Sequence, residues 1–359
     1  ESLSNHFVED EHFCYFDDMY SPDYTCYDIL KSIITQIKTG KVPAEDVNHL
    51  DKGIAKIAKM WQLIKAVFDV VAMLRKDGGI QIVHIHTSSY TGFNRSKIFI
   101  KIAKAFGKKV VLHIHGGSFR EFYQTSPASI SRTLDACDCI IALSESWKAF
   151  FCKVTKTKVC IVDNIIPQPQ RVLGIKNDDT FHLLFLGLIT AQKGIYDLLE
   201  VIKEIRHDLK DKFCLHIGGN GETERLQEMI DENDLSDLVN FEGWVSGEKK
   251  KELFSLADAY ILPSYIEGLP ISILEAMSFG LPILSTPVGG IPEVVDETNG
   301  ILFTPGDKKK MADAIKSIVN NPQIGKSMGN ASREKAVRYY PDNVASELIE
   351  IYNGILTAD

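Results

Sequence analysis

Residues 264–280 read SYIEGLPISILEAMSFG and define how the second half of the chain folds. Apolar residues from Ile271 onward recur at helical spacing behind Pro270, and a proline is well tolerated in the first turn of a helix. Gly280 supplies a stop, so we predict a helix from about Pro270 to Phe279. The run ADAYIL just before it is typical of a buried strand. Such a helix begins at the carboxyl edge of a parallel sheet, where open α/β folds bind ligands.

The same alternation of short apolar runs and longer amphipathic segments extends through most of the chain. Short runs rich in β-branched residues between helical segments are typical of buried parallel strands. We therefore predict an α/β protein with two doubly wound, Rossmann-like domains and a cleft between them. The candidate strands are Ile82–His86, Val110–His115, Cys139–Leu143, Val159–Val162, His182–Leu186, Phe213–Ile217, Val239–Phe241, Ala259–Leu262 and Pro282–Ser285. Examples of the helical segments are Ser96–Phe106, Ile195–Leu209 and Glu222–Asn233.

The weakest organisation falls at residues 165–180, where two prolines, a glycine and a polar cluster predict a domain linker. We expect one domain over residues 1–166 and a second over residues 167–340. The start of the chain lacks the strand and glycine-rich turn that usually open such a domain. Its first 30 residues contain one plausible strand, His12–Phe16, and the first glycine is Gly40. The fold either starts differently or lacks its first βα unit, and we expect the latter.

Composition and charge argue against several classes of protein. With 45% hydrophobic and 25% charged residues, the sequence is typical of a folded protein, and its apolar runs are far shorter than a membrane span. The net charge of −8 is uneven: residues 1–165 carry 21 basic and 18 acidic side chains, and the rest carries 19 and 30. This balance argues against nucleic-acid binding. Seven scattered cysteines and no recognisable signal peptide predict a cytoplasmic protein.

Glu267 and Glu275 flank the start of the predicted helix. At 1.5 Å per residue they lie roughly 12 Å apart, which is too far for an acid/base carboxylate pair of the glycoside-hydrolase kind. The free N–H groups and positive dipole at the helix start favour a diphosphate, and Gly268 lets the backbone approach closely. The two carboxylates then suit the two ends of a nucleotide sugar. The alternative is that Glu267 is a solvated loop residue and Glu275 a surface helix residue.

Two glycine-containing loops follow other predicted strands. GLITAQKG, residues 187–194, places Lys193 where a cation could face phosphates, although a solvated loop lysine would have the same pattern. GGNGE, residues 218–222, lacks the third glycine of a dinucleotide fingerprint. It predicts close backbone approach to a ligand at Gly219 and Gly221 rather than NAD binding.

Together these stretches resemble a known family. The block EGLPISILEAMSFGLPILSTPVGGIPEVV, preceded by ADAYILPSYIEG, is similar to the retaining GT-B glycosyltransferases of family 4, also called glycosyl transferases group 1. The similarity runs from LLFLGLITAQKG to GILFTPGD. More loosely, IVHIHTSSYTGFNRSK, VVLHIHGGSFREFY and IIALSESWKAFF resemble bacterial members that build surface polysaccharides. The resemblance implies a GT-B fold with an acceptor-side first domain, a nucleotide-sugar-binding second domain, and a C-terminal helix within residues 341–359 that crosses back to the first.

The resemblance also implies a role for each matching residue. Glu275 corresponds to the glutamate that binds the nucleotide ribose, and Glu267 to the one that meets the donor sugar hydroxyls. Lys193 corresponds to the phosphate-binding lysine, and His115 to the first-domain histidine near the reacting centre. We therefore expect His115, Lys193 and Glu267 to be catalytic. The other expected donor contacts are Gly116, Gly187, Gly219, Gly221, Gly268, Leu269, Pro270 and Ile271.

The chain departs from the family pattern in two places. Leu188 stands where the motif G-R-L-x-x-x-K-G has a second phosphate-binding arginine, and the first strand with its glycine-rich loop is not recognisable. By position alone, His113 and His86 compete with His115 for the role near the reacting centre. No Asp-x-Asp motif is present. We accordingly expect metal-independent transfer, with no metal site and no cofactor besides the nucleotide-sugar donor.

The expected activity is transfer of a sugar from a UDP-sugar, in preference to a GDP-sugar, to a glycan or lipid-linked acceptor in surface-polysaccharide synthesis. A non-catalytic nucleotide-sugar-binding or assembly protein of the same fold is the alternative, prompted by Leu188. A hydrolysing or epimerising GT-B enzyme would instead place acid/base carboxylates in the cleft. Residues 94–109, NRSKIFIKIAKAFGKK, either pack on the first sheet or make a peripheral contact at the inner face of the membrane.

Overall fold

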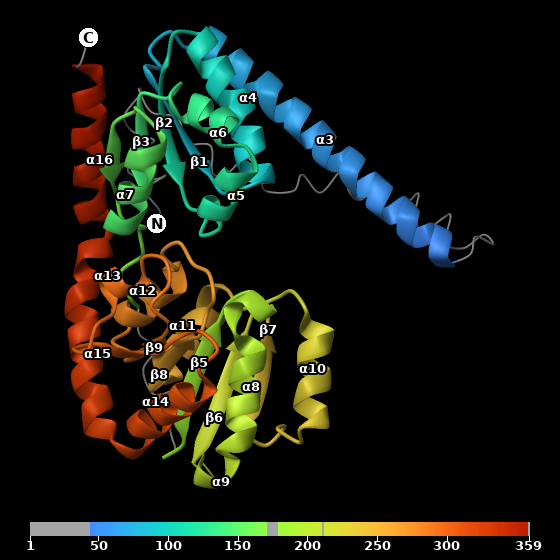
Figure 1. The fold of residues 1–359 in the computed structure, drawn as a ribbon, viewed down its shortest axis with the longest axis vertical. Helices are drawn as coiled ribbons and strands as arrows, with labels where there is room; N and C mark the ends of the chain where they lie inside the picture. The colour runs from blue at the N-terminus through green and yellow to red at the C-terminus, as the bar shows by residue number, and fades with distance from the viewer. Residues whose placement is uncertain (1–43, 171–178, 210–211, 358–359) are drawn as a thin grey trace.

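The computed structural model describes residues 44–170, 179–209 and 212–357, with side chains from residue 60 onward. These residues form two lobes, each built around one parallel sheet (Figure 1). The predicted strand His12–Phe16 and the middle of the predicted linker lie outside the described residues.

The first sheet has four parallel strands in the order β1-β2-β3-β4. Its central strands are apolar and buried, as expected where helices cover a parallel sheet. The strands are β1 (Ile82–Thr87), β2 (Lys109–Ile114), β3 (Cys139–Ala142) and β4 (Val159–Ile161). The helices are α3 (Ala44–Lys76), α4 (Thr91–Ala105), α5 (Phe119–Thr125), α6 (Pro127–Leu134) and α7 (Glu145–Val154).

The second sheet has six parallel strands in the order β10-β9-β8-β5-β6-β7, so β5 and β8 are neighbours although β6 and β7 lie between them in sequence. The strands are β5 (Phe181–Leu186), β6 (Phe213–Gly218), β7 (Val239–Gly243), β8 (Ala259–Leu262), β9 (Ile283–Ser285) and β10 (Gly300–Leu302). The helices are η2 (Ala191–Lys193), α8 (Ile195–Glu204), α9 (Arg206–Leu209), α10 (Thr223–Glu232), α11 (Gly247–Leu256), α12 (Ile271–Ser278), α13 (Ile291–Val294), α14 (Lys308–Asn320), α15 (Pro322–Ala336) and η3 (Val337–Tyr339).

The last helix joins the two lobes. α15 and α16 (Pro341–Leu356) follow one another along one side of both lobes, and α16 lies against the first (Figure 1). Its Val344, Leu348 and Tyr352 are buried in one cluster with Val111 and Ile141 of the first sheet. The first domain therefore has a core built from both ends of the described chain.

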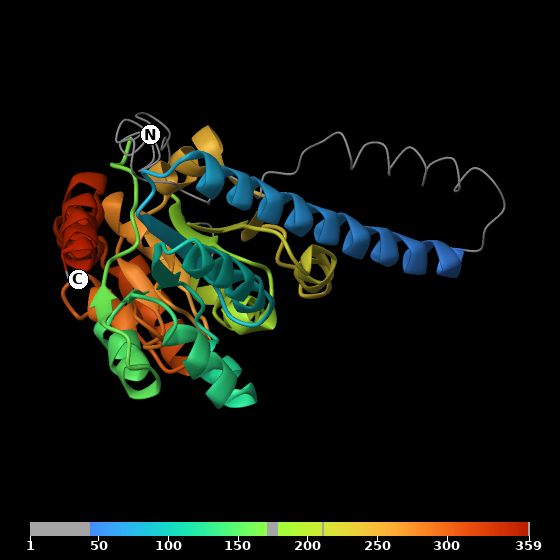
Figure 2. The same ribbon diagram turned by 90° about the horizontal axis from the view of Figure 1, so that it is seen from above.

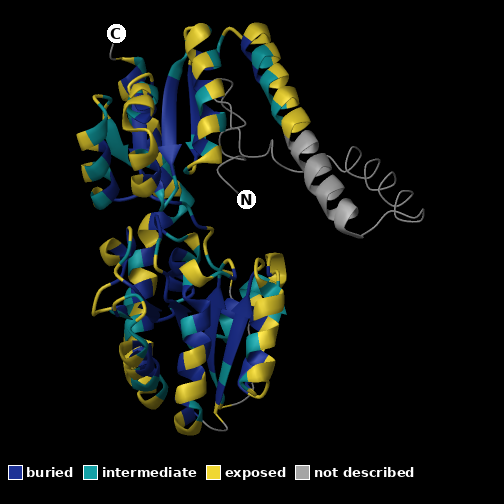
Figure 3. Ribbon diagram, turned by 45° about the vertical axis from the view of Figure 1, so that its right-hand side comes forward, coloured by how far each residue is buried: buried dark blue, intermediate teal, exposed yellow. Residues whose placement is uncertain are grey.

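Helices α3 and α4 differ in how they meet the body of the protein. α3 extends away from it (Figure 2), and over residues 60–76 it buries Val70 and Leu74 against the first core while many of its other side chains are exposed (Figure 3). α4 instead buries Phe99 and packs Ile102 and Phe106 against the first core, which leaves Ile98 as its exposed large apolar side chain. The apolar face predicted within residues 94–109 is thus largely used by packing on the first sheet. In the part of the chain that the structure describes, every helix is too short or too polar to span a bilayer.

The predicted fold class is confirmed, and each predicted strand that falls within the described residues is present with ends shifted by at most two residues. Four local features differ. The helix predicted from Ser96 begins at Thr91. β10, a three-residue edge strand, was not predicted; Ile195–Leu209 divides into α8 and α9 at Ile205; and Pro270 occupies the N-cap, one residue before the first helical position. Gly280 has φ +76°, the left-handed conformation expected where a helix stops.

Close packing between α12 and α15 depends on a helical glycine. A Cβ on Gly329 would lie 2.2 Å from the carbonyl oxygen of Gly280. Gly329→Ala would therefore force the backbone of α15 and that of Gly280 apart. We expect it to lower the free energy of unfolding by about 1–3 kcal/mol in urea titrations. Gly354→Ala is the matched control, because nothing lies within 4 Å of its Cβ position in α16. That change should raise stability by up to about 1 kcal/mol, and equal losses in both variants would contradict the packing.

Candidate donor site at the domain interface

Lys193 and Glu267 meet at the carboxyl edge of the second sheet. Lys193 ends η2 after β5, and Glu267 lies in the loop after β8, the strand beside β5. The Glu267 Oε1 atom lies 2.5 Å from Lys193 Nζ and accepts a hydrogen bond of 2.7 Å from the Ser264 hydroxyl. Glu267 is buried, and a buried carboxylate needs such partners. The two predicted residues therefore form one charged pair, and the solvated-loop alternative for Glu267 is wrong.

The start of α12 lies directly after this pair. Leu269 is buried, Pro270 is the N-cap, and Ile271 is the first helical residue with its side chain about half exposed. The Gly268 carbonyl accepts a 2.6 Å hydrogen bond from the N–H of Gly290, which fixes the loop ahead of the helix. α12 therefore begins four residues after Glu267, the ion-pair partner of Lys193. This combination of a cation and a helix start favours an anionic group.

Glu275 is not a freely solvated helix residue. It lies in α12 with little exposed surface, and its Oε1 atom lies 2.7 Å from Lys250 Nζ in α11. Sequence reasoning missed Lys250, although the run of three lysines at 249–251 on a helix beside the carboxyl edge of the sheet was a signal for it.

The loop after β2 in the first domain packs against the loop between β8 and α12, residues 263–270, which we call the donor loop. A Cβ on Gly117 would lie 2.5 Å from the carbonyl carbon of Glu267, and one on Gly268 would lie 2.8 Å from the His115 carbonyl oxygen. Gly116 is equally tight against the loop after β1, where its Cβ would lie 2.5 Å from the Ser89 hydroxyl. Only glycines allow the two domains to approach this closely.

His115 is connected to the second domain through Asn164. Its Nε2 atom lies 2.8 Å from His86 Nδ1, and it has a further hydrogen bond with Asn164. The Asn164 amide in turn donates a 2.8 Å hydrogen bond to the Leu269 carbonyl. Burial, with a smaller contribution from His86, lowers the pKa of His115 to about 3. His115 is therefore a neutral, firmly oriented imidazole at neutral pH, and Asn164 is a positioning residue that sequence reasoning missed.

The competing histidines lie farther from the donor loop. His113 is buried within β2, and His86 is half-buried in β1, directly before its last residue Thr87. His115 follows β2 directly and is the histidine whose backbone touches Gly268. Of the three, the structure brings His115 to the donor loop.

The glycines of the other two loops pack on one another. A Cβ on Gly219 would lie 1.9 Å from the Gly187 carbonyl oxygen, and one on Gly221 would lie 2.6 Å from the Ile189 carbonyl oxygen. Ile189 and Gly221 form a parallel bridge between the loops. The two loops thus form one unit beside Lys193. Leu188, at the position where the family pattern has arginine, points a half-exposed apolar side chain outward from it.

A second interdomain contact fixes the orientation of the lobes. Both carboxylate oxygens of Glu293, in α13, accept hydrogen bonds from backbone N–H groups at the start of α7, from Glu145 at 2.7 Å and Ser146 at 3.0 Å. A carboxylate at a helix start is stabilised by the unpaired N–H groups and the dipole. Arg338 and the buried Asp163 add an ion pair of 2.5 Å nearby.

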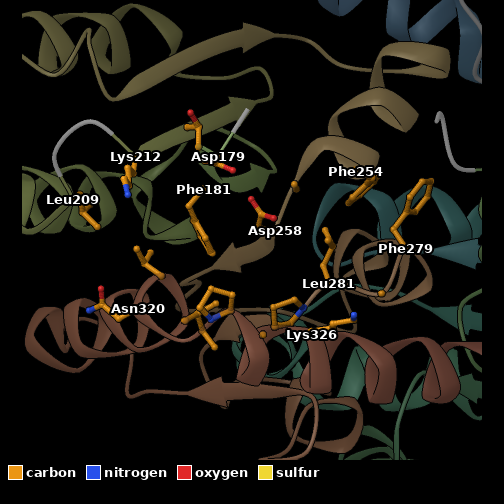
Figure 4. A pocket seen from close by; sticks show the side chains of 18 of the residues that line it. Asp179, Phe181, Leu209, Lys212, Phe254, Asp258, Phe279, Leu281, Asn320 and Lys326 are labelled. Atoms are coloured by element: carbon orange, nitrogen blue, oxygen red, sulfur yellow. The ribbon is translucent and has the colours of Figure 1, made fainter. Parts of the chain in front are cut away.

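A cavity also lies at the other end of the second sheet (Figure 4). It has a volume of about 740 Å³ and is lined by residues that precede strands, among them Asp179, Lys212 and Asp258. Ligands of open parallel sheets bind beyond the carboxyl ends of the strands. We therefore place the donor site at Lys193 and Glu267 and not in this cavity.

Comparison with known proteins agrees with this architecture. Residues 33–167 match the family model "Glycosyltransferase Family 4", and residues 169–335 match the model "Glycosyl transferases group 1". The chain therefore belongs to the family that these two models describe. Each half of the chain matches the part of the family that the sequence motifs indicated.

Individual relatives of the glycosyltransferase are distant. An uncharacterized glycosyltransferase of Methanocaldococcus jannaschii is 29% identical over 61% of this chain, and the match spans 60% of that relative's length. Sucrose-phosphate synthase from Thermosynechococcus elongatus superimposes with a TM-score of 0.74 at 21% identity, covering 89% of this chain and 81% of the other. HepE of Anabaena, solved in complex with UDP, has a TM-score of 0.68 at 17% identity, covering 79% of this chain and 82% of its own. At these identities the structures show the shared fold alone.

The buried histidines make the stability of the first domain depend on pH. Burial, with smaller contributions from neighbouring histidines, holds the pKa values of His84, His113 and His115 below the ordinary 6.5. Below pH 6.5 the unfolded chain binds protons that the folded chain excludes, so stability present above pH 6.5 is lost as the pH falls. Each histidine contributes up to about 1.4 kcal/mol per pH unit.

We expect the urea midpoint of the first domain to fall clearly between pH 7.5 and pH 5.5. In His113→Leu the fall should be smaller, whereas the exposed His207→Gln should behave as wild type. An unchanged midpoint over this range in the wild-type protein would contradict the burial of neutral imidazoles.

Proposed function

We propose that this protein transfers a sugar from a nucleotide diphosphate donor to an acceptor hydroxyl, with retention of the anomeric configuration. The observation that carries the proposal is the meeting of Lys193, Glu267 and the start of α12 at one sheet edge, against His115 of the first domain. A cation and a helix start suit the diphosphate, and a buried carboxylate next to them suits sugar hydroxyls.

In the proposed reaction the bond between the anomeric carbon and the diphosphate oxygen breaks, and a bond from that carbon to the acceptor oxygen forms on the same face. The leaving diphosphate takes the acceptor proton. Lys193 and the N–H groups of α12 stabilise the charge that develops on it, which is the largest contribution we assign to the protein. We propose that a metal ion is not required, because these groups supply the positive charge and the sequence has no Asp-x-Asp motif.

Neutral His115 fits a binding role better than an acid role. With a pKa of about 3 it cannot hold a proton to deliver at neutral pH, but its imidazole is held by His86 and Asn164 in one orientation. We propose that it lines the sugar subsite from the first domain, opposite Glu267. With the donor bound, the Glu275 carboxylate would accept hydrogen bonds from the ribose hydroxyls in place of the Lys250 ammonium.

We also propose the class of donor and of acceptor. A UDP-sugar is favoured because HepE, which has the same fold, was solved with UDP. The acceptor, a glycan or lipid-linked intermediate of surface-polysaccharide synthesis, rests on the sequence resemblance alone. Peripheral contact with the inner face of the membrane through residues 94–109 stays a prediction, which cosedimentation with anionic liposomes would test. Leu188 keeps the non-catalytic nucleotide-sugar binder as the alternative, since one expected phosphate cation is missing.

A panel of UDP-, GDP- and ADP-sugars tests the proposal by calorimetric binding and by release of the nucleotide. We expect one donor class to bind and to be turned over slowly in water without acceptor. Lys193→Ala should lower turnover by about 100-fold or more, because it removes charge stabilisation in the transition state. Glu275→Gln should mainly raise KM, because ribose contacts act equally in the ground state.

Lys203→Ala is the matched control, since Lys203 is an exposed lysine of α8 that only contacts Asn233 in the described structure. Turnover that survives in Lys193→Ala would contradict the proposed site. Binding without turnover, including with acceptor extracts, would favour the non-catalytic alternative.

A further inference from the structure

Four histidines gather on one face of the first sheet. His84 and His86 are two residues apart in β1, and His113 pairs in register with His86 from β2. Side chains two residues apart point to the same face of a strand, so the imidazoles stack beside one another with His115 next in line. Ring centroids lie 4.5 Å apart for His84 and His86, and 5.0 Å apart for His86 and His113.

The imidazole of His113 is buried without a hydrogen bond to any described residue. Its side chain is only 5% exposed, and neither Nδ1 nor Nε2 has a hydrogen-bond partner among the described residues. A buried polar atom left unsatisfied costs about 1–3 kcal/mol, and native structures rarely contain one without a reason. A ligand bound by one of these nitrogens would supply that reason.

The other two histidines are each oriented by a hydrogen bond at Nδ1. His84 Nδ1 is hydrogen-bonded to the hydroxyl of Tyr352 in α16, and His86 Nδ1 is hydrogen-bonded to His115 Nε2. A hydrogen bond donated from Nδ1 keeps the ring proton on that nitrogen and leaves the lone pair on Nε2. In metal sites, neighbouring groups orient the ligating histidines in this way. The candidate ligand atoms of His84, His86 and His113 all lie within 4.8 Å of one another.

We propose that His84, His86 and His113 bind one Zn²⁺ ion inside the first domain. Three imidazoles are an established zinc-binding set, with water in the fourth position. At Zn–N distances of 2.0–2.1 Å the ligand atoms of a tetrahedral site lie about 3.4 Å apart, so small side-chain rotations would close the set around the ion.

A second histidine cluster provides a comparison within the same chain. His182, Cys214 and His216 also carry potential ligand atoms within 4.8 Å of one another. Both nitrogens of His216 are occupied, however, by His182 Nδ1 at 3.0 Å and by the Glu242 carboxylate at 2.8 Å. This second cluster is a satisfied hydrogen-bond chain, and we assign no metal to it.

The proposed ion would lie away from the donor diphosphate and act on the domain interface. Zinc at His86 Nε2 fixes the proton on Nδ1, which then donates to His115 Nε2. His115 is in turn hydrogen-bonded to Asn164, whose amide donates to the Leu269 carbonyl ahead of α12. This chain of contacts gives the ion a positioning role. Zinc binding itself does not depend on the proposed transferase activity.

The test uses the full chain, produced with a histidine-free tag so that the tag binds no metal. Zinc content after dialysis is measured by inductively coupled plasma mass spectrometry, and Co²⁺ is titrated into the metal-free protein while its visible absorption is recorded. We expect about one tightly bound ion per chain with the spectrum of a tetrahedral site, as three histidines and water would give.

His113→Gln should lower metal affinity by at least about 10-fold, and Tyr352→Phe, which removes only the partner of His84, should lower it by about 10-fold. His216→Gln should keep wild-type affinity. Circular dichroism identifies any variant that fails to fold, and Tyr352→Phe keeps the packing of the ring. A wild-type chain that binds no zinc or cobalt at micromolar concentrations would overturn the proposal, as would loss of the metal in His216→Gln but not in His113→Gln.

Discussion

The ion pair between Lys193 and Glu267 is the contact on which the site depends. It joins loops that follow β5 and β8, two strands that are neighbours in the sheet but about 75 residues apart in sequence. Because Glu267 is buried, loss of its cation would leave an uncompensated charge, which typically costs about 3–5 kcal/mol. The pair therefore fixes both loops at once, and with them the start of α12. The diphosphate of a donor would replace Glu267 as the partner of Lys193, and the Glu267 carboxylate would keep its hydrogen bond from the Ser264 hydroxyl.

Glycines allow the backbone of the first domain to pack directly against the loop that carries Glu267. At Gly117 and Gly268 the backbones of the two domains approach so closely that a Cβ on either would overlap the other domain. Glu293 adds a second anchor at the start of α7, and α16 carries the chain from the second domain back onto the first sheet. The two lobes are thus fixed around one point, where His115, Glu267 and the start of α12 come together.

The strands were predictable because buried parallel strands are continuous apolar runs, and the carboxyl-edge loops followed from them. β10 was missed because it has three residues and ends a sheet, so it carries little hydrophobic signal. The lysine run at 249–251 signalled a cation near the sheet edge, but its pairing with Glu275 could not be found from spacing because Lys250 meets Glu275 between two helices. Asn164 carried no such signal, since it meets Leu269 only across the domain interface. Likewise the stacking of His84, His86 and His113 depends on the register of β1 against β2, which the sequence alone does not fix.

A nucleotide diphosphate bound between Lys193 and the first turn of α12 is the core of the proposed function. A crystal structure with UDP tests it most directly. We expect diphosphate oxygens within hydrogen-bond distance of Lys193 Nζ and of backbone N–H groups at the start of α12, with the ribose at Glu275. UDP bound in the cavity of about 740 Å³ at the opposite edge of the sheet, or with Lys193 still paired to Glu267 and no contact to α12, would contradict it.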